Sequence, residues 1–170
     1  LGLLLFRRLG PRTHPPPSLG QGMMRSTPEW WDRMADLYRR SNALLGTDPD
    51  FTALVLADPT FHSQTWLLLS PDKTRLQGLV RVVDREVSCL AIEPDERRQG
   101  HGRRIMAWLR DHHQPFHLSC LGTNHDALAF YRSLPWLQEG PTVEHISRRQ
   151  KICYTLVYFD CPAPVRNSNF

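Results

Sequence analysis

The stretch EPDERRQGHGRRIMAWL, residues 93–109, joins a segment typical of a β-strand to one typical of an amphipathic helix. Gly100 and Gly102 stand where the helical pattern begins, although glycine is about 1 kcal/mol worse than alanine inside a helix. The amino end of a helix carries free N–H groups and about half a positive charge, so it binds anions. Glycine lacks a Cβ, which lets an anion approach the backbone closely. The flanking arginines complete a predicted site for phosphate or pyrophosphate: Arg97, Arg98, Arg103 and Arg104.

The pattern around this stretch predicts both helices and strands. Residues 65–70, 76–84 and 86–94 are short runs rich in β-branched residues, and we expect three consecutive antiparallel strands. The helix at 100–113 should point Ile105, Met106 and Leu109 toward the core. Further strands are expected at 116–122 and 151–159, and further helices from Thr27 to near Gly46 and at 124–134. Residues 48–62, which include two prolines, could form a short helix or a strand, and the helix is favoured.

Two of these helices carry recognisable start signals. Thr27, Pro28 and Glu29 supply a hydroxyl cap, a proline at the first helical position and an acid in the first turn. Asn124 is a candidate cap for the helix that follows it. The central order of strand, helix, strand and helix implies a parallel crossover. The predicted fold class is therefore α/β (α+β with a mixed sheet): a central, mostly antiparallel sheet with a parallel β-α-β crossover, flanked by helices.

Length and charge predict one domain with short tails. Four of the 21 Lys and Arg residues lie in residues 1–25, which contain no acid, so the remaining 17 balance the 17 Asp and Glu residues. A neutral body argues against nucleic acid as a partner, because phosphate contacts depend on clustered Lys and Arg. Residues 1–24 read as a disordered or non-native tail, with a transit peptide as the alternative. We expect the folded domain at 25–162 and a short tail at 163–170.

The four cysteines show no CxxC or zinc-ligand spacing. Free thiols are the simplest interpretation, with no metal site and a cytoplasmic location. The apolar run near the start is too short to span a bilayer, so no membrane association is expected. Cys120 is interpreted as a small core residue. The cysteines are Cys89, Cys120, Cys153 and Cys161.

The glycine spacing discriminates among phosphate-binding motifs. A dinucleotide-binding fingerprint needs a third glycine where this chain has Ile105, and a Walker loop needs a Gly-Lys pair, which is absent. What remains is Arg97-Arg98-Gln99-Gly100-His101-Gly102, or R-x-x-G-x-G. This hexapeptide resembles the acetyl-CoA signature of the GNAT acetyltransferase superfamily, [QR]-x-x-G-x-[GA].

A second motif strengthens the resemblance. Residues 124–131, NHDALAFY, are similar to the superfamily's N-x-x-A-x-x-F-Y helix and follow the next strand in the expected order. The two motifs with their strands span about residues 86–140. The chain departs from the family after this helix, where it has Ser-Leu-Pro-Trp at 133–136 in place of the common Gly-Phe pair. The resemblance implies a GNAT fold and acetyl-CoA as cosubstrate.

The resemblance also implies roles for individual residues. The backbone of the central strand would bond the pantetheine arm and polarise the thioester carbonyl, and the glycine turn would hold the pyrophosphate. The acceptor would be a small-molecule or protein amine, and the protein a monomer or homodimer. The implied cofactor-binding residues are Leu90, Ala91, Ile92, Arg97, Arg98, Gln99, Gly100, His101, Gly102, Arg103, Asn124 and Tyr131.

Acyl transfer to an amine needs a proton donor for the leaving thiolate, and a phenol can serve. Tyr131 is the predicted general acid and Glu93 the first candidate for the base, with His117 second; loss of the amine proton to solvent is a further alternative. Each residue also has a simpler interpretation. The glycines could form only a tight turn, Tyr131 could be core, Glu93 could be a solvated acid, and His101, His112 and His113 are expected to be solvated. The alternative function is a non-catalytic coenzyme A-binding module.

Overall fold

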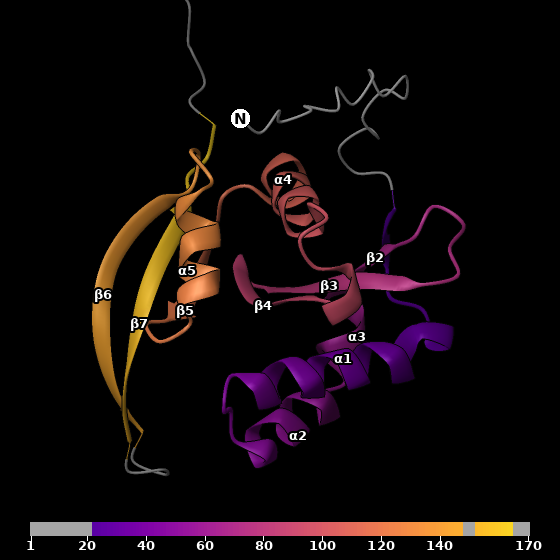
Figure 1. Ribbon diagram of the computed structural model, residues 1–170, viewed down its shortest axis with the longest axis horizontal. Coiled ribbons are helices and arrows are strands. Elements are labelled where there is room, and N and C mark those ends of the chain that lie inside the picture. Colours follow the sequence, from indigo (N-terminus) through magenta and orange to yellow (C-terminus); the bar gives the residue numbers. More distant parts are fainter. Residues whose placement is uncertain (1–21, 148–151, 165–170) are drawn as a thin grey trace, which may run out of the picture.

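The computed structural model describes residues 22–147 and 152–164, and these form one seven-stranded mixed sheet with helices on both faces (Figure 1). The strand order is β1-β2-β3-β4-β5-β7-β6. The strands are β1 Met23–Arg25, β2 Thr65–Leu69, β3 Leu76–Val83, β4 Glu86–Ile92, β5 Phe116–Leu121, β6 Gln138–Ser147 and β7 Ile152–Cys161. The helices are α1 Trp31–Leu44, α2 Pro49–Ala57, α3 Thr60–Ser63, α4 His101–His113 and α5 His125–Arg132.

Strands β2, β3 and β4 form the predicted antiparallel meander. Their side chains alternate between two cores, because successive residues of a strand face opposite sides of the sheet. Leu67 and Leu69 face the core shared with α1 and α3, while Leu68 faces the core shared with α4. The apolar runs are continuous along the sequence because both faces of these strands are covered.

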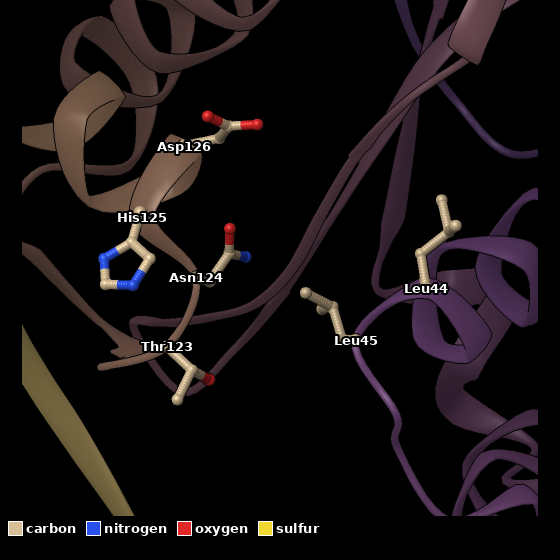
Figure 2. Close-up of a pocket in the computed structure, with 6 residues that line it drawn as sticks. All are labelled: Leu44, Leu45, Thr123, Asn124, His125 and Asp126. Carbon is tan, nitrogen blue, oxygen red and sulfur yellow. The ribbon is translucent and has the colours of Figure 1, made fainter.

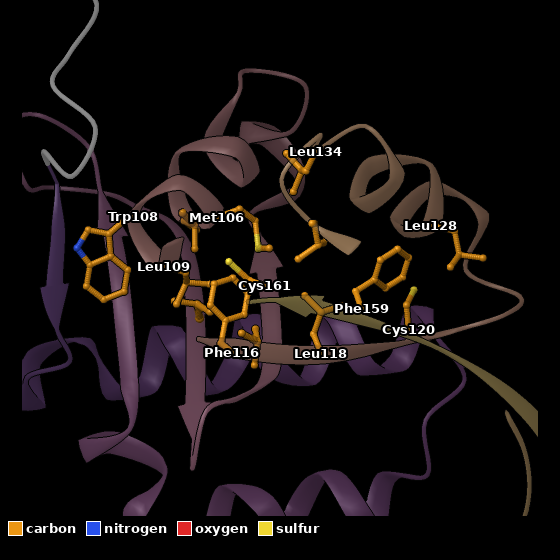
Figure 3. Packing of buried hydrophobic residues seen from close by; sticks show 14 of the residues in the cluster. Met106, Trp108, Leu109, Phe116, Leu118, Cys120, Leu128, Leu134, Phe159 and Cys161 are labelled. Atoms are coloured by element: carbon orange, nitrogen blue, oxygen red, sulfur yellow. The ribbon is translucent and has the colours of Figure 1, made fainter. Parts of the chain in front are cut away.

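Two helical layers cover the sheet (Figure 1). Helices α4 and α5 lie on one face, where Ile105, Met106 and Leu109 are fully buried as predicted. Their core includes side chains from β5 and β7, among them Leu118 and Phe159 (Figure 3). Helices α1, α2 and α3 lie on the opposite face. The helical segment predicted at 48–62 is confirmed as α2 and α3.

The crossover through α4 makes β4 and β5 parallel neighbours that soon separate. In the described residues the pairing consists of Glu86 opposite His117, together with a hydrogen bond from the His117 N–H to the Arg85 carbonyl at 2.9 Å. Beyond this point β5 pairs with β7 and β4 pairs with β3. The edge of β4 that faces β5 is therefore open over its carboxyl-terminal half.

The structure adds two strands that the sequence did not predict. Strand β1 pairs with β2, so Met23 and Met24, which we assigned to the tail, belong to the sheet. Residues 1–21 lie outside the described residues. Strand β6 pairs with β7 at the edge of the sheet. It contains Gly140 and Pro141, which are poor strand residues and are tolerated at an edge, where one side makes no ladder.

Of the two predicted helix caps, Asn124 is confirmed and Thr27 is wrong. The Asn124 Oδ1 accepts a hydrogen bond from the Ala127 N–H at 3.2 Å and caps α5 as expected. Thr27 makes no side-chain cap. Residues Pro28–Trp30 instead form a short 3-10 helix that leads into α1 at Trp31.

Candidate functional site

The turn before α4 has the backbone geometry of an anion nest. Arg98 has φ +61° and Gly100 has φ +84°, so two residues just before the helix adopt the left-handed backbone conformation. Such conformations direct successive N–H groups into a concave surface that suits an anion. A Cβ added at Gly100 would meet no atom within 4 Å, so this residue faces open space and is needed for its φ angle.

Glycine is required at position 102 for a different reason, which is close packing against α5. A Cβ at this position would lie 3.1 Å from Cζ of Phe130, which is closer than an ordinary contact. Gly102 therefore allows α5 to approach the first turn of α4. The R-x-x-G-x-G motif and the N-x-x-A-x-x-F-Y motif are in direct contact at this point.

The predicted cofactor residues surround this turn. The Arg97 Nε lies 3.5 Å from the Ile92 carbonyl at the end of β4, and the Arg103 guanidinium donates to the Ser133 hydroxyl at 2.8 Å. Arg98 and Gln99 are exposed. The first amides of a helix have no partner within it, so those of α4 remain available to a ligand.

Tyr131 lies on α5, with its ring centroid 5.2 Å from that of Phe130 and 5.4 Å from that of Phe159. Burial raises the pKa of Tyr131 above the ordinary value of 10.0, and the nearby Cys120 and Cys89 thiols add to the effect. Those thiols belong to β5 and β4, so the phenol lies close to both diverging strands. The phenol remains protonated at neutral pH and can act as a proton donor.

The two candidate bases differ in position. Glu93 follows β4 directly, and its carboxylate binds the Arg40 guanidinium of α1, with an Nη2–Oε1 distance of 3.0 Å. His117 is exposed and lies opposite Glu86, at the end where β4 and β5 are still paired. That end is remote along both strands from Ile92 and from the β5–α5 loop. Glu93 therefore lies at the open end of β4, and His117 lies at the paired end.

Of the three histidines expected to be solvated, His112 is exposed, whereas His101 is buried and His113 is half-buried. His101 is 7% exposed and its Nε2 lies 3.1 Å from an oxygen of Glu96, which is 6% exposed. The rings of both His112 and His113 contact Trp108. Glu96 was not predicted as part of the site. Its only signal was its place five residues before His101, and that spacing does not identify a pair across a turn.

A cavity of about 360 Å³ lies between the corner that joins α1 to α2 and the loop that joins β5 to α5 (Figure 2). Leu44 and Leu45 line one wall and are 71% and 44% exposed. Thr123, Asn124, His125 and Asp126 line the other wall. The cavity therefore has one apolar wall and one polar wall, and includes the cap residue of α5.

The residues after α5, where the chain departs from the family pattern, are well packed. Leu134 is 4% exposed, and the Trp136 ring makes an edge contact with Phe116 at 6.4 Å between centroids. The Arg110 guanidinium lies 5.3 Å from the centre of the Trp136 ring. The unusual segment thus closes the core beside α4.

Across residues 22–147 and 152–164, no group of three or more His, Cys, Asp and Glu side chains could hold a metal ion. In the same part of the chain, no helix has the length and hydropathy needed to cross a membrane.

The sheet is mixed, and two of its strands, β4 and β5, diverge beside the turn that begins α4. This combination is typical of the fold of the acyl-CoA-dependent acetyltransferases. The profile of the Acetyltransferase (GNAT) family matches residues 31–134, and the chain belongs to this family. Acetyl-CoA, the cosubstrate expected from the sequence, is the cosubstrate of the family. No curated protein sequence matches the chain.

Solved structures share the fold at low sequence identity. The apo form of YjaB from Escherichia coli is 15% identical, with a TM-score of 0.63 over 84% of this chain and 97% of that chain. YncA from Salmonella typhimurium, solved with its cofactor acetyl-CoA, is 13% identical, with a TM-score of 0.62 over 87% and 96%. The ribosomal-protein-S18-alanine N-acetyltransferase of Escherichia coli is 16% identical, with a TM-score of 0.58 over 87% and 97%. These likenesses confirm the predicted GNAT fold.

Proposed function

We propose that the protein transfers the acetyl group of acetyl-CoA to a primary amine by direct attack of the amine. The observation that carries the proposal is a juxtaposition of three features. An anion nest begins α4, a protonated phenol lies on α5, and the edge of β4 beside them is open. Family membership supports the reaction class.

The turn before α4 would hold the pyrophosphate. The backbone amides from Arg98 to Arg103 point the partial positive charge of the helix at the anion, and the Arg97 side chain adds a full charge. The open edge of β4 leaves the backbone of Leu90, Ala91 and Ile92 free to bond the pantetheine arm. A backbone donor placed at a developing oxyanion contributes about 3 kcal/mol.

Acetyl-CoA supplies the acetyl group as an activated thioester. The amine nitrogen would add to the thioester carbon, which places negative charge on the carbonyl oxygen, and the carbon–sulfur bond would then break as the carbonyl re-forms. Over the two steps one proton leaves the amine and one reaches the sulfur. Tyr131 donates its phenolic proton to the departing sulfur. Glu93, directly or through a water, accepts the proton from the amine, and Asn124 contacts the cofactor from the start of α5.

The acceptor would enter through the cavity between the α1–α2 corner and the β5–α5 loop. Its wall of Leu44 and Leu45 suits the apolar part of an acceptor, and Asp126 on the opposite wall suits a cation. A small-molecule amine and a protein amine both fit this description. The name of the ribosomal-protein neighbour supports a protein acceptor as one class. All four cysteines are free, which supports a cytoplasmic location.

The cofactor site is tested by the melting temperature with and without saturating acetyl-CoA. Ligand at 100 times its dissociation constant adds about 2.7 kcal/mol, or roughly 5–10 °C for a domain of this size. The shift should disappear in the double variant Arg97→Ala, Gly100→Val. Amines are then screened for release of free thiol. A folded wild-type protein that shows no shift would contradict the proposal.

A further inference from the structure

A buried carboxylate lies directly before the anion nest. Glu96 ends the 3-10 helix Pro94–Glu96 and is 6% exposed. A carboxylate removed from water to this extent is unfavourable unless donors replace the lost hydration. Its neighbour Asp95 is exposed. The two consecutive acids therefore have opposite environments.

Three side chains supply donors to Glu96. The Arg75 Nη1 lies 2.6 Å from Oε1, the Gln77 Nε2 lies 3.3 Å from Oε2, and the His101 Nε2 lies 3.1 Å from Oε2. Because a carboxylate only accepts hydrogen bonds, the His101 Nε2 carries a proton. We call these four residues the Glu96 cluster: Arg75, Gln77, Glu96 and His101.

The Glu96 cluster fixes the nest at both ends. Glu96 and His101 enclose residues 97–100, so their contact closes a short loop that contains the left-handed Arg98 and Gly100. Gln77 belongs to β3, and its backbone carbonyl also accepts from the Glu93 N–H at 3.0 Å. The end of β4 is therefore bound to β3 through Glu93, and the turn and the first residue of α4 are bound to β3 through Glu96.

The left-handed conformation of Arg98 shows why such ties matter. A non-glycine residue in this region is strained, and the strained conformation persists only where the surrounding structure enforces it. Arg98 itself is exposed, so its own side chain provides little restraint. The enforcing contacts are those on either side of it, at Glu96 and His101.

We propose that Glu96 is a positioning residue for the cofactor phosphates. It holds His101 and β3 together so that the amides of residues 98–102 converge on the pyrophosphate before the cofactor arrives. This inference rests on the proposed function, because it assigns the same turn to pyrophosphate. Preorganised donors bind more tightly than donors that must be ordered on binding.

Simple electrostatics makes the opposite prediction. A carboxylate next to an anion site repels the anion, so removal of its charge should tighten binding. Positioning predicts weaker binding on the same change. The sign of the effect therefore separates the two explanations.

The first experiment compares Glu96→Gln with Asp95→Asn by calorimetric or NMR titration. Both variants remove one negative charge from the same short helix, but only the Glu96 side chain belongs to the cluster and binds His101. Glu96→Gln should weaken coenzyme A binding about tenfold or more, the effect expected when charge-assisted hydrogen bonds are lost. Asp95→Asn should leave binding unchanged or slightly tighter. Pantetheine, which lacks the pyrophosphate, should bind both variants as it binds the wild type.

If Glu96→Gln does not fold, a second pair of variants tests the positioning role of Glu96. His101→Leu removes the donor to Glu96, whereas His101→Gln keeps an amide donor of similar reach. The first should weaken coenzyme A binding and the second should largely restore it. Unchanged or tighter coenzyme A binding in Glu96→Gln, or in His101→Leu where Glu96→Gln does not fold, would overturn the inference, as would an equal loss for pantetheine. Failure of the wild type to bind coenzyme A would instead contradict the proposed function.

Discussion

Arg40 on α1 binds both carboxylate oxygens of Glu93, with nitrogen–oxygen distances of 3.0 and 3.1 Å. The same guanidinium donates through Nε to Asp36 at 2.8 Å. The pairing raises the pKa of Arg40, mainly through the hydrogen bonds to Glu93. The helix that covers one face of the sheet is thereby joined to the end of the central strand, where the reaction is proposed to occur.

This arrangement gives a test of Glu93 as the base. Glu93→Gln should lower kcat by about 100-fold, the lower range for general acid–base catalysis, with no change in coenzyme A affinity. Asp36→Asn is the matched control, because it removes the other carboxylate bound to Arg40. Steady-state rates of thiol release with an active amine measure both. Equal losses in the two variants would assign the effect to the ion-pair network instead of proton transfer.

Tyr131→Phe should lower kcat by about 100-fold or more and leave coenzyme A affinity unchanged, because only the proton donor is removed. Burial raises the pKa of the phenol above 10.0, so its protonated form persists from neutral pH to beyond that value. The wild-type rate should therefore show no decline from Tyr131 deprotonation below pH 10.0. A normal rate in the variant would remove the acid role, and a protein with cofactor affinity but no activity would be a binding module.

Gly100→Ala should weaken coenzyme A binding, and Gly46→Ala should not. Both glycines have positive φ, +84° and +68°, and in both cases an added Cβ meets no atom within 4 Å. Each substitution should lower the free energy of unfolding by about 1 kcal/mol, because alanine disfavours this region. Urea denaturation and calorimetric titration measure the two effects. Loss of affinity in Gly46→Ala as well would show that general destabilisation, and not the nest, controls binding.

The thiols of Cys89 and Cys120 should be chemically inert. Burial raises the pKa of Cys89 to about 12 and that of Cys120 to about 11. The reactive form is the thiolate, so both should resist iodoacetamide near neutral pH while the exposed Cys153 reacts. Peptide mass spectrometry measures the order of modification. An acetylated Cys89 or Cys120 after incubation with acetyl-CoA would contradict direct attack by the amine.

The sequence predicted those parts of the site that depend on local pattern. Residues 86–113 contain an apolar run, a proline, two glycines and then a helical period, and each signal is contained within a few residues. The Asn124 cap and the face of α4 that carries Ile105 and Leu109 were predicted for the same reason. The roles of Tyr131 and Glu93 in catalysis remain predictions.

Tertiary structure decided the features that depend on contacts between distant residues. Strands β1 and β6 are held by pairing with β2 and β7 at the two edges of the sheet, and their own sequences carry little strand pattern. The burial of Glu96 depends on Arg75 and Gln77, about 20 residues away, and the position of Glu93 depends on Arg40.

Local propensity and periodicity thus determined the helices, most of the strands and the glycine turn before α4 from the sequence alone, because each arises from neighbours along the chain. The divergence of β4 from β5, the contact of Gly102 with Phe130 and the closure of the nest by Glu96 were decided only by folding. Each of these requires side chains from separate elements to meet. The pattern of residues along the chain does not predict these contacts.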